Sequence, residues 1–172
     1  MSSFKNILGI VVAFIAFIAY SSYFVVDERQ KALVLRFGEI NRSVENPGLY
    51  FKVPFADSVT LIEDRILIWE NNDRPVQDIA SQVYIVDAIT LARIKDTKLF
   101  RETLGADLVQ AEARVAARLD SALRQTYGRR SFDAALSSDR SVMMREIRDE
   151  LRKEADTFGI EIVDVRVRRT DL

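Results

Sequence analysis

The sequence contains no cysteine and no histidine among its 172 residues. Their absence excludes disulfide bonds, thiol nucleophiles, Ser-His-Asp triads and zinc sites built from cysteine and histidine. The chain also has no large excess of either charge, because its formal net charge is -1. A basic surface for nucleic acid is therefore not indicated. The six glycines are scattered, so no glycine-rich phosphate-binding loop is present in the sequence.

Charged residues and proline are also missing from the run Ile7–Val26, ILGIVVAFIAFIAYSSYFVV. As a helix, this run would be about 30 Å long, which matches the hydrocarbon core of a bilayer. The run therefore predicts a membrane-spanning anchor helix, preceded by a short tail over residues 1–6. A cleaved signal peptide and a soluble buried helix remain alternative interpretations. The sequence holds no second run of this kind, which predicts a single-pass protein.

Two properties of the anchor bear on its surroundings. Lys5 lies before it, and Arg29 and Lys31 lie after it, so positive charge is nearly equal on the two sides. The shortness of the amino-terminal tail favours a cytoplasmic amino terminus. Small residues spaced three to four apart share one side of the helix and are candidates for packing against another helix: Gly9, Ala13 and Ala16. The alternative is that small residues are simply common in such helices.

The chain after the anchor begins with strand signals. The expected strands are Ala32–Phe37, Leu49–Val53, Val59–Ile62, Arg65–Trp69 and Val83–Ile94, with a turn at Asn46-Pro47-Gly48 and a loop over 71–74. The longest of them has no cleanly polar face, which indicates a central strand that is covered on both sides.

The second half of the chain changes to a helical period. Asp107 is the expected cap of a helix that ends at Gly128, and Ser137 or Ser138 is the expected cap of another that ends at Gly159. The apolar stripes expected to face the core are Leu108, Ala111, Val115, Leu119 and Ala122 in the first helix, and Met143, Ile147, Leu151 and Ala155 in the second.

The last expected strand, Ile160–Arg169, contains apolar residues of both parities. This change of parity predicts a bulge near Ile162 and Val163, or burial on both faces. The order of strands, then helices, then a returning strand predicts one α+β domain over 27–172, with a mainly antiparallel sheet and packed helices.

The chain resembles the SPFH (band 7, prohibitin/stomatin-type) family over nearly its whole length. After the apolar amino-terminal run, the resemblance is carried by VVDERQKALVLRFGEI, NPGLYFKVPFADSV, DAITLARIKDTKLF, DLVQAEARVAARLDSALR and FGIEIVDVRVRRTDL. It implies an SPFH domain that lies against a bilayer and acts as a scaffold, with no cofactor and no enzymatic activity. Family members continue into a long carboxy-terminal coiled-coil helix, so the chain is expected to be truncated before that helix.

The resemblance also implies partners and a location. These are an HflK-like subunit and an FtsH-like AAA membrane protease, in a large hetero-oligomeric cage that regulates membrane-protein proteolysis. The implied location is the bacterial inner membrane, with the amino terminus cytoplasmic and the main domain periplasmic. A stomatin-like organiser of membrane microdomains, facing the cytoplasm, is the alternative.

Apolar residues near the Asn46-Pro47-Gly48 turn are the candidates for membrane contact: Leu49, Tyr50, Phe51, Val53 and Phe55. The alternative is that they form ordinary sheet core. For a membrane-bound serine peptidase, the available groups are a Ser58 and Lys52 dyad. The carboxylates of Asp57, Glu63 and Asp64 form a possible acidic cluster, but such charges are usually a solvated edge. The favoured interpretation is a protein without catalytic activity.

Overall fold

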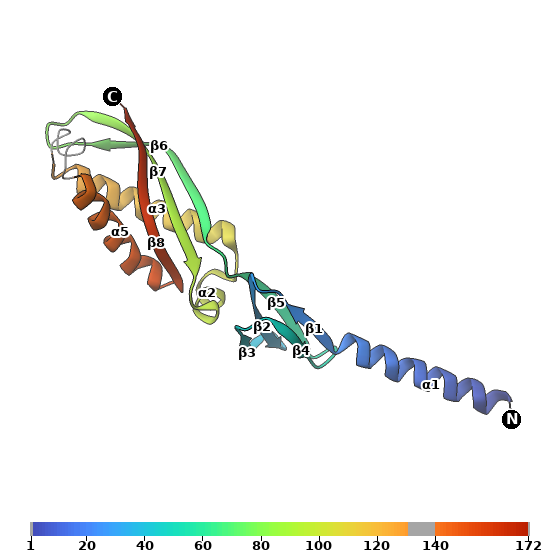
Figure 1. Ribbon diagram of the computed structural model, residues 1–172. Coiled ribbons are helices and arrows are strands. Elements are labelled where there is room, and N and C mark those ends of the chain that lie inside the picture. The colour runs from blue at the N-terminus through green and yellow to red at the C-terminus, as the bar shows by residue number, and fades with distance from the viewer. Residues whose placement is uncertain (1, 131–139, 172) are drawn as a thin grey trace. The chain divides into compact units, whose positions relative to one another are not determined.

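The structure is a computed structural model that describes residues 2–130 and 140–171 (Figure 1). The chain divides into two compact units, Met1–Glu63 and Asp64–Leu172. The predicted domain over 27–172 includes residues of both units, and its bounds stay a prediction. Every strand pair is antiparallel, which confirms the predicted α+β class with antiparallel sheets.

Unit 1 begins with helix α1 (Ser2–Ser21). The helix does not extend to Val26, so the predicted helical range Ile7–Val26 is wrong at its carboxyl end. The hydroxyls of Ser21 and Ser22 both donate to the carbonyl oxygen of Ile18, at 3.0 and 2.7 Å, and the chain then leaves the helix. In the part of the chain that the structure describes, no helix combines the length and the apolar content needed to cross a membrane.

Strand β1 (Tyr23–Val26) follows α1 after one residue and pairs with β4 (Gly48–Phe51). The connecting residue, Ser22, is buried, and its carbonyl oxygen accepts the amide of Lys52 at 2.7 Å. The sequence pattern missed β1 because its residues, YFVV, continue the apolar run of the helix without a break. Aromatic and β-branched side chains nevertheless suit an extended strand.

The second sheet of unit 1 has the order β3-β2-β5, formed by β3 (Glu39–Val44), β2 (Gln30–Arg36) and β5 (Asp57–Glu63). The expected strand Ala32–Phe37 is confirmed as far as Arg36, and Phe37 lies in the turn to β3. Strand β3 was not predicted, because its sequence EINRSV is largely polar. It forms here because it pairs along β2, with one register shift between Val34 and Leu35.

Unit 2 contains one three-stranded sheet with the order β6-β7-β8, formed by β6 (Leu67–Gln77), β7 (Val83–Ile94) and β8 (Ile160–Asp171). The bounds of β7 and its central position are as predicted. The loop expected over 71–74 is wrong, because these residues belong to β6 and form a bulge between Asn71 and Arg74, with Asp73 at φ 55°. The bulge expected in β8 is confirmed: Leu91 faces Asp164 and Ala92 faces Ile162, which leaves Val163 as the extra residue.

Within residues 64–130 and 140–171, the helices of unit 2 are α2 (Thr97–Leu104), α3 (Leu108–Tyr127) and α5 (Arg140–Asp156). The predicted cap of α3 is confirmed, since Asp107 Oδ1 accepts the amides of Val109 and Gln110 at 2.8 and 3.4 Å. The stripe residues of both helices are buried, except that Leu108 is half-buried. Helix α2 was not predicted. The capping candidates Ser137 and Ser138 lie outside the described residues.

The helices cover one face of the sheet. Along β7 the even-numbered residues from Tyr84 to Ile94 are buried, while the odd-numbered ones from Val83 to Arg93 are half-buried or exposed. Helix α3 packs against α5 and β6, and α5 packs against β8 (Figure 1). Within the described residues of unit 2, the expectation that β7 is covered on both sides is therefore wrong: the odd-numbered face has no covering layer.

Candidate functional site

The β1–β4 ribbon presents apolar side chains on its outer face. Tyr23 and Val25 of β1 lie opposite Phe51 and Leu49 of β4 in the strand register. Their exposed fractions are 54, 67, 53 and 67%, respectively. The rings of Tyr23 and Phe51 meet edge to face, with centroids 5.9 Å apart. Large apolar side chains that gather on an exposed surface usually mark an interaction site.

The inner face of the same ribbon is also apolar, but it is packed. Phe24 and Tyr50 lie opposite each other with ring centroids 5.9 Å apart. They cover the small buried cluster Val26, Ala32, Val34 and Val44, together with Val59. The ribbon is thus apolar on both faces because one face completes the core of unit 1, while the other remains exposed.

Two phenylalanines in neighbouring turns are even more exposed. Phe37, between β2 and β3, is 85% exposed, and Phe55, between β4 and β5, is 87% exposed. Both have positive φ, 51° and 68°, which is uncommon for a bulky residue and strains the backbone. The two turns are joined, because the amide of Phe37 donates to the carbonyl oxygen of Ala56 at 3.3 Å. We call Phe37 and Phe55 the phenylalanine pair.

An ion pair fixes the base of these two turns. Arg36 donates two hydrogen bonds to Asp57, from Nε to Oδ1 at 2.8 Å and from Nη2 to Oδ2 at 3.2 Å. This ion pair, which we call the Arg36–Asp57 clamp, lies at the end of the β2–β5 pairing. Asp57 Oδ2 also accepts the amide of Val53 at 2.9 Å. The bonds from Arg36, followed by the one from Val53, hold the pKa of Asp57 below its usual range. The carboxylate therefore stays charged at neutral pH, and the clamp is lost only as the pH falls through that lowered pKa.

Four of the five predicted membrane-contact residues are exposed, and the fifth is packed. Leu49, Phe51, Val53 and Phe55 are exposed, at 67, 53, 40 and 87%, whereas Tyr50 belongs to the packed face. For Tyr50 the alternative interpretation, ordinary core, fits better. Sequence reasoning did not single out Tyr23, Val25 or Phe37. A phenylalanine directly before a turn glycine, as in Phe37-Gly38, is the signal that could have found the last of these. Gly9, Ala13 and Ala16 lie exposed on α1, and their packing role stays a prediction.

Among the described residues, no hydrogen bond is seen between Ser58 and Lys52, the pair considered for catalysis. Ser58 is exposed on β5 and lies opposite Leu35, while the backbone of Lys52 is bonded to Ser22. The carboxylate of Asp57 is committed to the clamp with Arg36. Among the described residues, no group of three or more carboxylates lies close enough to hold a metal ion.

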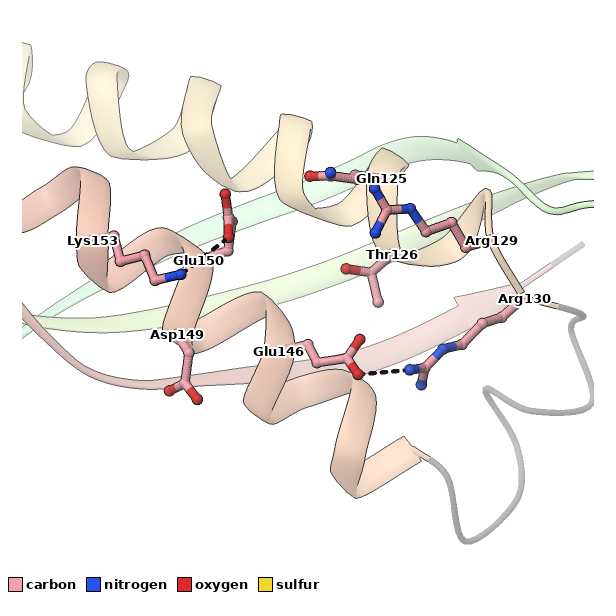
Figure 2. Close-up of a pocket in the computed structure, with 8 residues that line it drawn as sticks. All are labelled: Gln125, Thr126, Arg129, Arg130, Glu146, Asp149, Glu150 and Lys153. Atoms are coloured by element: carbon pink, nitrogen blue, oxygen red, sulfur yellow. Dashed lines mark hydrogen bonds and ion pairs between the residues drawn. The ribbon is translucent and has the colours of Figure 1, made fainter.

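Unit 2 has a groove of about 480 Å³ between the end of α3 and the side of α5 (Figure 2). Its charged lining is balanced, with basic Arg129, Arg130 and Lys153 and acidic Glu146, Asp149 and Glu150. Figure 2 shows Arg130 reaching Glu146, at 2.7 Å, and Lys153 beside Glu150, at 4.0 Å. The first pair links the segment after α3 to α5, and the second lies within α5. With three basic and three acidic side chains in its lining, the groove shows no preference for an anion or a cation.

Residues 24–172, which are most of the chain, match the SPFH domain / Band 7 family. The chain belongs to this family. The family predicted from the sequence is thereby confirmed.

Relatives within the family carry the name HflC. "Protein HflC" of Haemophilus influenzae is 30% identical over 94% of this chain and 58% of its own length. "Protein HflC" of Buchnera aphidicola subsp. Schizaphis graminum is 27% identical over 98% of this chain and 62% of its own. "Modulator of FtsH protease HflC" of Escherichia coli K12 is 30% identical over 86% of this chain and 46% of its own. The chain thus spans about half the length of these relatives.

Proposed function

We propose that this SPFH chain is a membrane-bound scaffold subunit that works by binding rather than by catalysis. It assembles with an HflK-like subunit into a large hetero-oligomer around an FtsH-like protease and regulates the degradation of membrane proteins. The proposed location is the bacterial inner membrane, with the amino terminus cytoplasmic and unit 2 periplasmic. The proposal draws on the name of the Escherichia coli relative, a modulator of FtsH protease.

The observation that carries the membrane part of the proposal is the surface of α1. Its large apolar side chains from Ile7 to Phe17 are exposed on every side of the helix, by 47 to 69%. A helix that is hydrophobic all round requires an apolar environment, which is either a protein core or a bilayer. The outer face of the β1–β4 ribbon continues this apolar surface directly after Ser22. We infer that a bilayer covers both.

The phenylalanine pair fits the edge of such a bilayer. Burying one phenylalanine side chain contributes about 1.5–3 kcal/mol relative to leaving it in water. Two such residues held on strained turns by the Arg36–Asp57 clamp are positioned to enter the interface without any change of the fold. The proposed membrane-contact set is therefore Tyr23, Val25, Leu49, Phe51, Val53, Phe55 and Phe37.

A tryptophan probe tests this contact. The chain has one tryptophan, Trp69, which is 6% exposed and gives a constant background. In the variant Phe37→Trp, we expect the added fluorescence to shift to shorter wavelength in lipid vesicles and to be quenched by brominated lipid. The matched control is Val109→Trp, which replaces a residue that is 75% exposed on α3 and should stay in water. Equal quenching of both probes would contradict the proposed contact surface.

The regulatory role is tested by reconstitution. The full chain, an HflK-like subunit and an FtsH-like protease are placed in one vesicle preparation, and degradation of a membrane-protein substrate is followed with and without the chain. We expect the three to co-purify in mild detergent, and the degradation rate to change when the chain is present. The chain alone should not cleave the substrate, and Ser58→Ala should behave like the unchanged protein. Proteolysis by the chain alone that is lost in Ser58→Ala would overturn the proposal.

A further inference from the structure

A second groove of unit 2, between α5 and β8, is lined mainly by arginines. The helix and the strand pack side by side (Figure 1), and the groove between them has a volume of about 350 Å³. The charged side chains of its lining are Arg140, Arg145, Arg148, Asp164 and Arg166. The whole chain has 25 basic and 26 acidic residues, so this ratio of four cations to one anion is a local feature. We call this site the arginine groove.

Two of the four arginines are already neutralised by carboxylates. Arg148 bonds Asp149 at 2.9 Å, and Arg166 bonds Asp164 at 2.8 Å. Both pairs are partly exposed and therefore contribute little to stability. They cancel two positive charges of the groove, so the remaining two arginines decide which ligand it attracts.

The remaining arginines keep their full charge. Arg140 donates Nη2 to the carbonyl oxygen of Val167 at 2.7 Å, and this neutral acceptor fixes the side chain without cancelling its charge. Arg145 is exposed and forms no hydrogen bond or ion pair with another residue of the described part of the chain. Within the described residues, the groove therefore holds two uncompensated cations and favours an anionic ligand.

The floor of the arginine groove is apolar. It contains the half-buried side chain of Met144 and the buried side chains of Val165 and Val167. The neighbouring backbone of β8 is partly occupied, because the amide of Val165 donates to Asp164 Oδ1 at 2.9 Å and the carbonyl oxygen of Val167 accepts Arg140. A ligand is thus expected to bind through its side chains, both charged and apolar, rather than by adding a strand to the sheet.

The positions of the two uncompensated arginines indicate the shape of the ligand. Arg140 and Arg145 are five residues apart on α5, which separates their backbones by about 7.5 Å along the helix axis. Because Arg140 is held at Val167, the two cations suit two separate anionic groups better than one phosphate. In an extended peptide, alternate side chains lie on the same side, about 6.6 Å apart. Carboxylates at alternate positions therefore match the two arginines.

We propose that the arginine groove binds an extended acidic peptide segment of another protein. Two carboxylates at alternate positions bind Arg140 and Arg145, because hydrogen bonds between guanidinium and carboxylate groups are strong and directional. Apolar side chains on the same side of the peptide contact Met144 and the valines of the floor. The site goes beyond the proposed function: it lies in unit 2 and does not depend on the membrane contact proposed for unit 1.

Two peptides of the same composition test the proposed spacing. The probe is Leu-Ser-Glu-Ser-Glu-Ser-Leu, with blocked ends and an uncharged fluorophore, and its anisotropy is followed as the full chain is added in non-ionic detergent. The control is Glu-Ser-Leu-Ser-Leu-Ser-Glu, which places the carboxylates about 20 Å apart. We expect the probe to bind at least fivefold more tightly, and its affinity to fall as salt is added. Equal affinities, or no binding of the probe, would overturn the proposal.

Two variants with the same change of charge locate the binding site. Arg145→Ala removes an exposed cation from the groove and should weaken probe binding at least fivefold. The matched control is Arg124→Ala, because Arg124 is exposed on α3 and lies outside the lining of the groove. It should bind the probe like the unchanged protein, and far-ultraviolet circular dichroism checks that both variants are folded. Equal losses would show that the peptide follows net charge rather than this groove, which contradicts the proposal.

Competition distinguishes a peptide from other anions. Pyrophosphate, or phosphatidylglycerol added to the detergent, is titrated against the bound probe. We expect either one to displace the probe only at a concentration at least tenfold above that of unlabelled probe. Displacement at the same or a lower concentration would assign the groove to a phosphate ligand and overturn the peptide proposal. None of these measurements uses an FtsH-like protease or a bilayer, so their outcome is independent of the proposed function.

Discussion

Replacing Gly159 by alanine is expected to destabilise unit 2 by about 3–5 kcal/mol, the range in which single changes often unfold a domain. Gly159 has φ 74°, a conformation that disfavours any side chain. A Cβ atom there would clash with the carbonyl oxygen of Asp96 and lie 2.9 Å from the amide nitrogen of Phe100. Both are backbone atoms, so neither can move aside like a side chain.

The clash also breaks local hydrogen bonds. The carbonyl oxygen of Gly159 accepts the amides of Lys95 and Asp96, at 2.9 and 3.1 Å, and Asp96 caps α2. The measurement is urea unfolding followed by the fluorescence of Trp69, which lies buried in the same unit. The control is Gly105→Ala, because Gly105 has a similar φ of 66° but open space around its Cβ position. We expect a loss of only about 1 kcal/mol for the control, and equal losses would refute the steric explanation.

Replacing Ile147 by alanine is expected to lower the free energy of unfolding by about 2–5 kcal/mol. Ile147 is fully buried on the face of α5 that packs against the sheet and α3. Shortening the side chain removes its contacts and leaves a cavity that the rigid strands and helices only partly fill. The same urea titration measures the loss.

The matched control for Ile147 lies on the same helix. Val142→Ala removes apolar atoms from a position that is 38% exposed, so the expected change is under about 1 kcal/mol. Alanine has a high helix propensity, so neither substitution lowers the helix propensity of α5. A control loss as large as that of Ile147→Ala would mean that burial is not the cause.

The parts of the fold that could be predicted are those in which one local signal dominates. Asp107 caps α3 because a carboxylate before an apolar stripe satisfies the free amides of the first turn. The switch of parity in Ile160–Arg169 predicted a bulge near Ile162 and Val163 or burial on both faces, and the structure has the bulge at Val163, because an extra residue keeps both Ile162 and Val165 on the core face. In both cases the information lies within a few neighbouring residues.

The elements that were missed depend on distant residues. Strand β1 reads as the end of a helix until β4, more than twenty residues later, supplies its partner. Strand β3 has few apolar residues and takes its shape from β2. Helix α2 is short, and its buried residues Thr97, Phe100 and Leu104 give too brief a stripe to stand out.

The candidate site was only partly predictable, because it too depends on residues that are distant in the sequence. An apolar residue in the sequence does not reveal whether it faces inward or outward. The register of β1 on β4 separates exposed Leu49 and Phe51 from packed Tyr50. The backbone conformation of Phe37 and its link to the Phe55 turn exist only in the folded chain.

The single-residue connection at Ser22 has a mechanical consequence. Its amide is bonded to Ala19 of the helix and its carbonyl oxygen to Lys52 beyond β4, so both of its peptide groups are held. These two hydrogen bonds restrict rotation of the backbone at Ser22. A rotation of α1 about its axis would therefore be transmitted to the β1–β4 ribbon, and a rotation of the ribbon would be transmitted to α1.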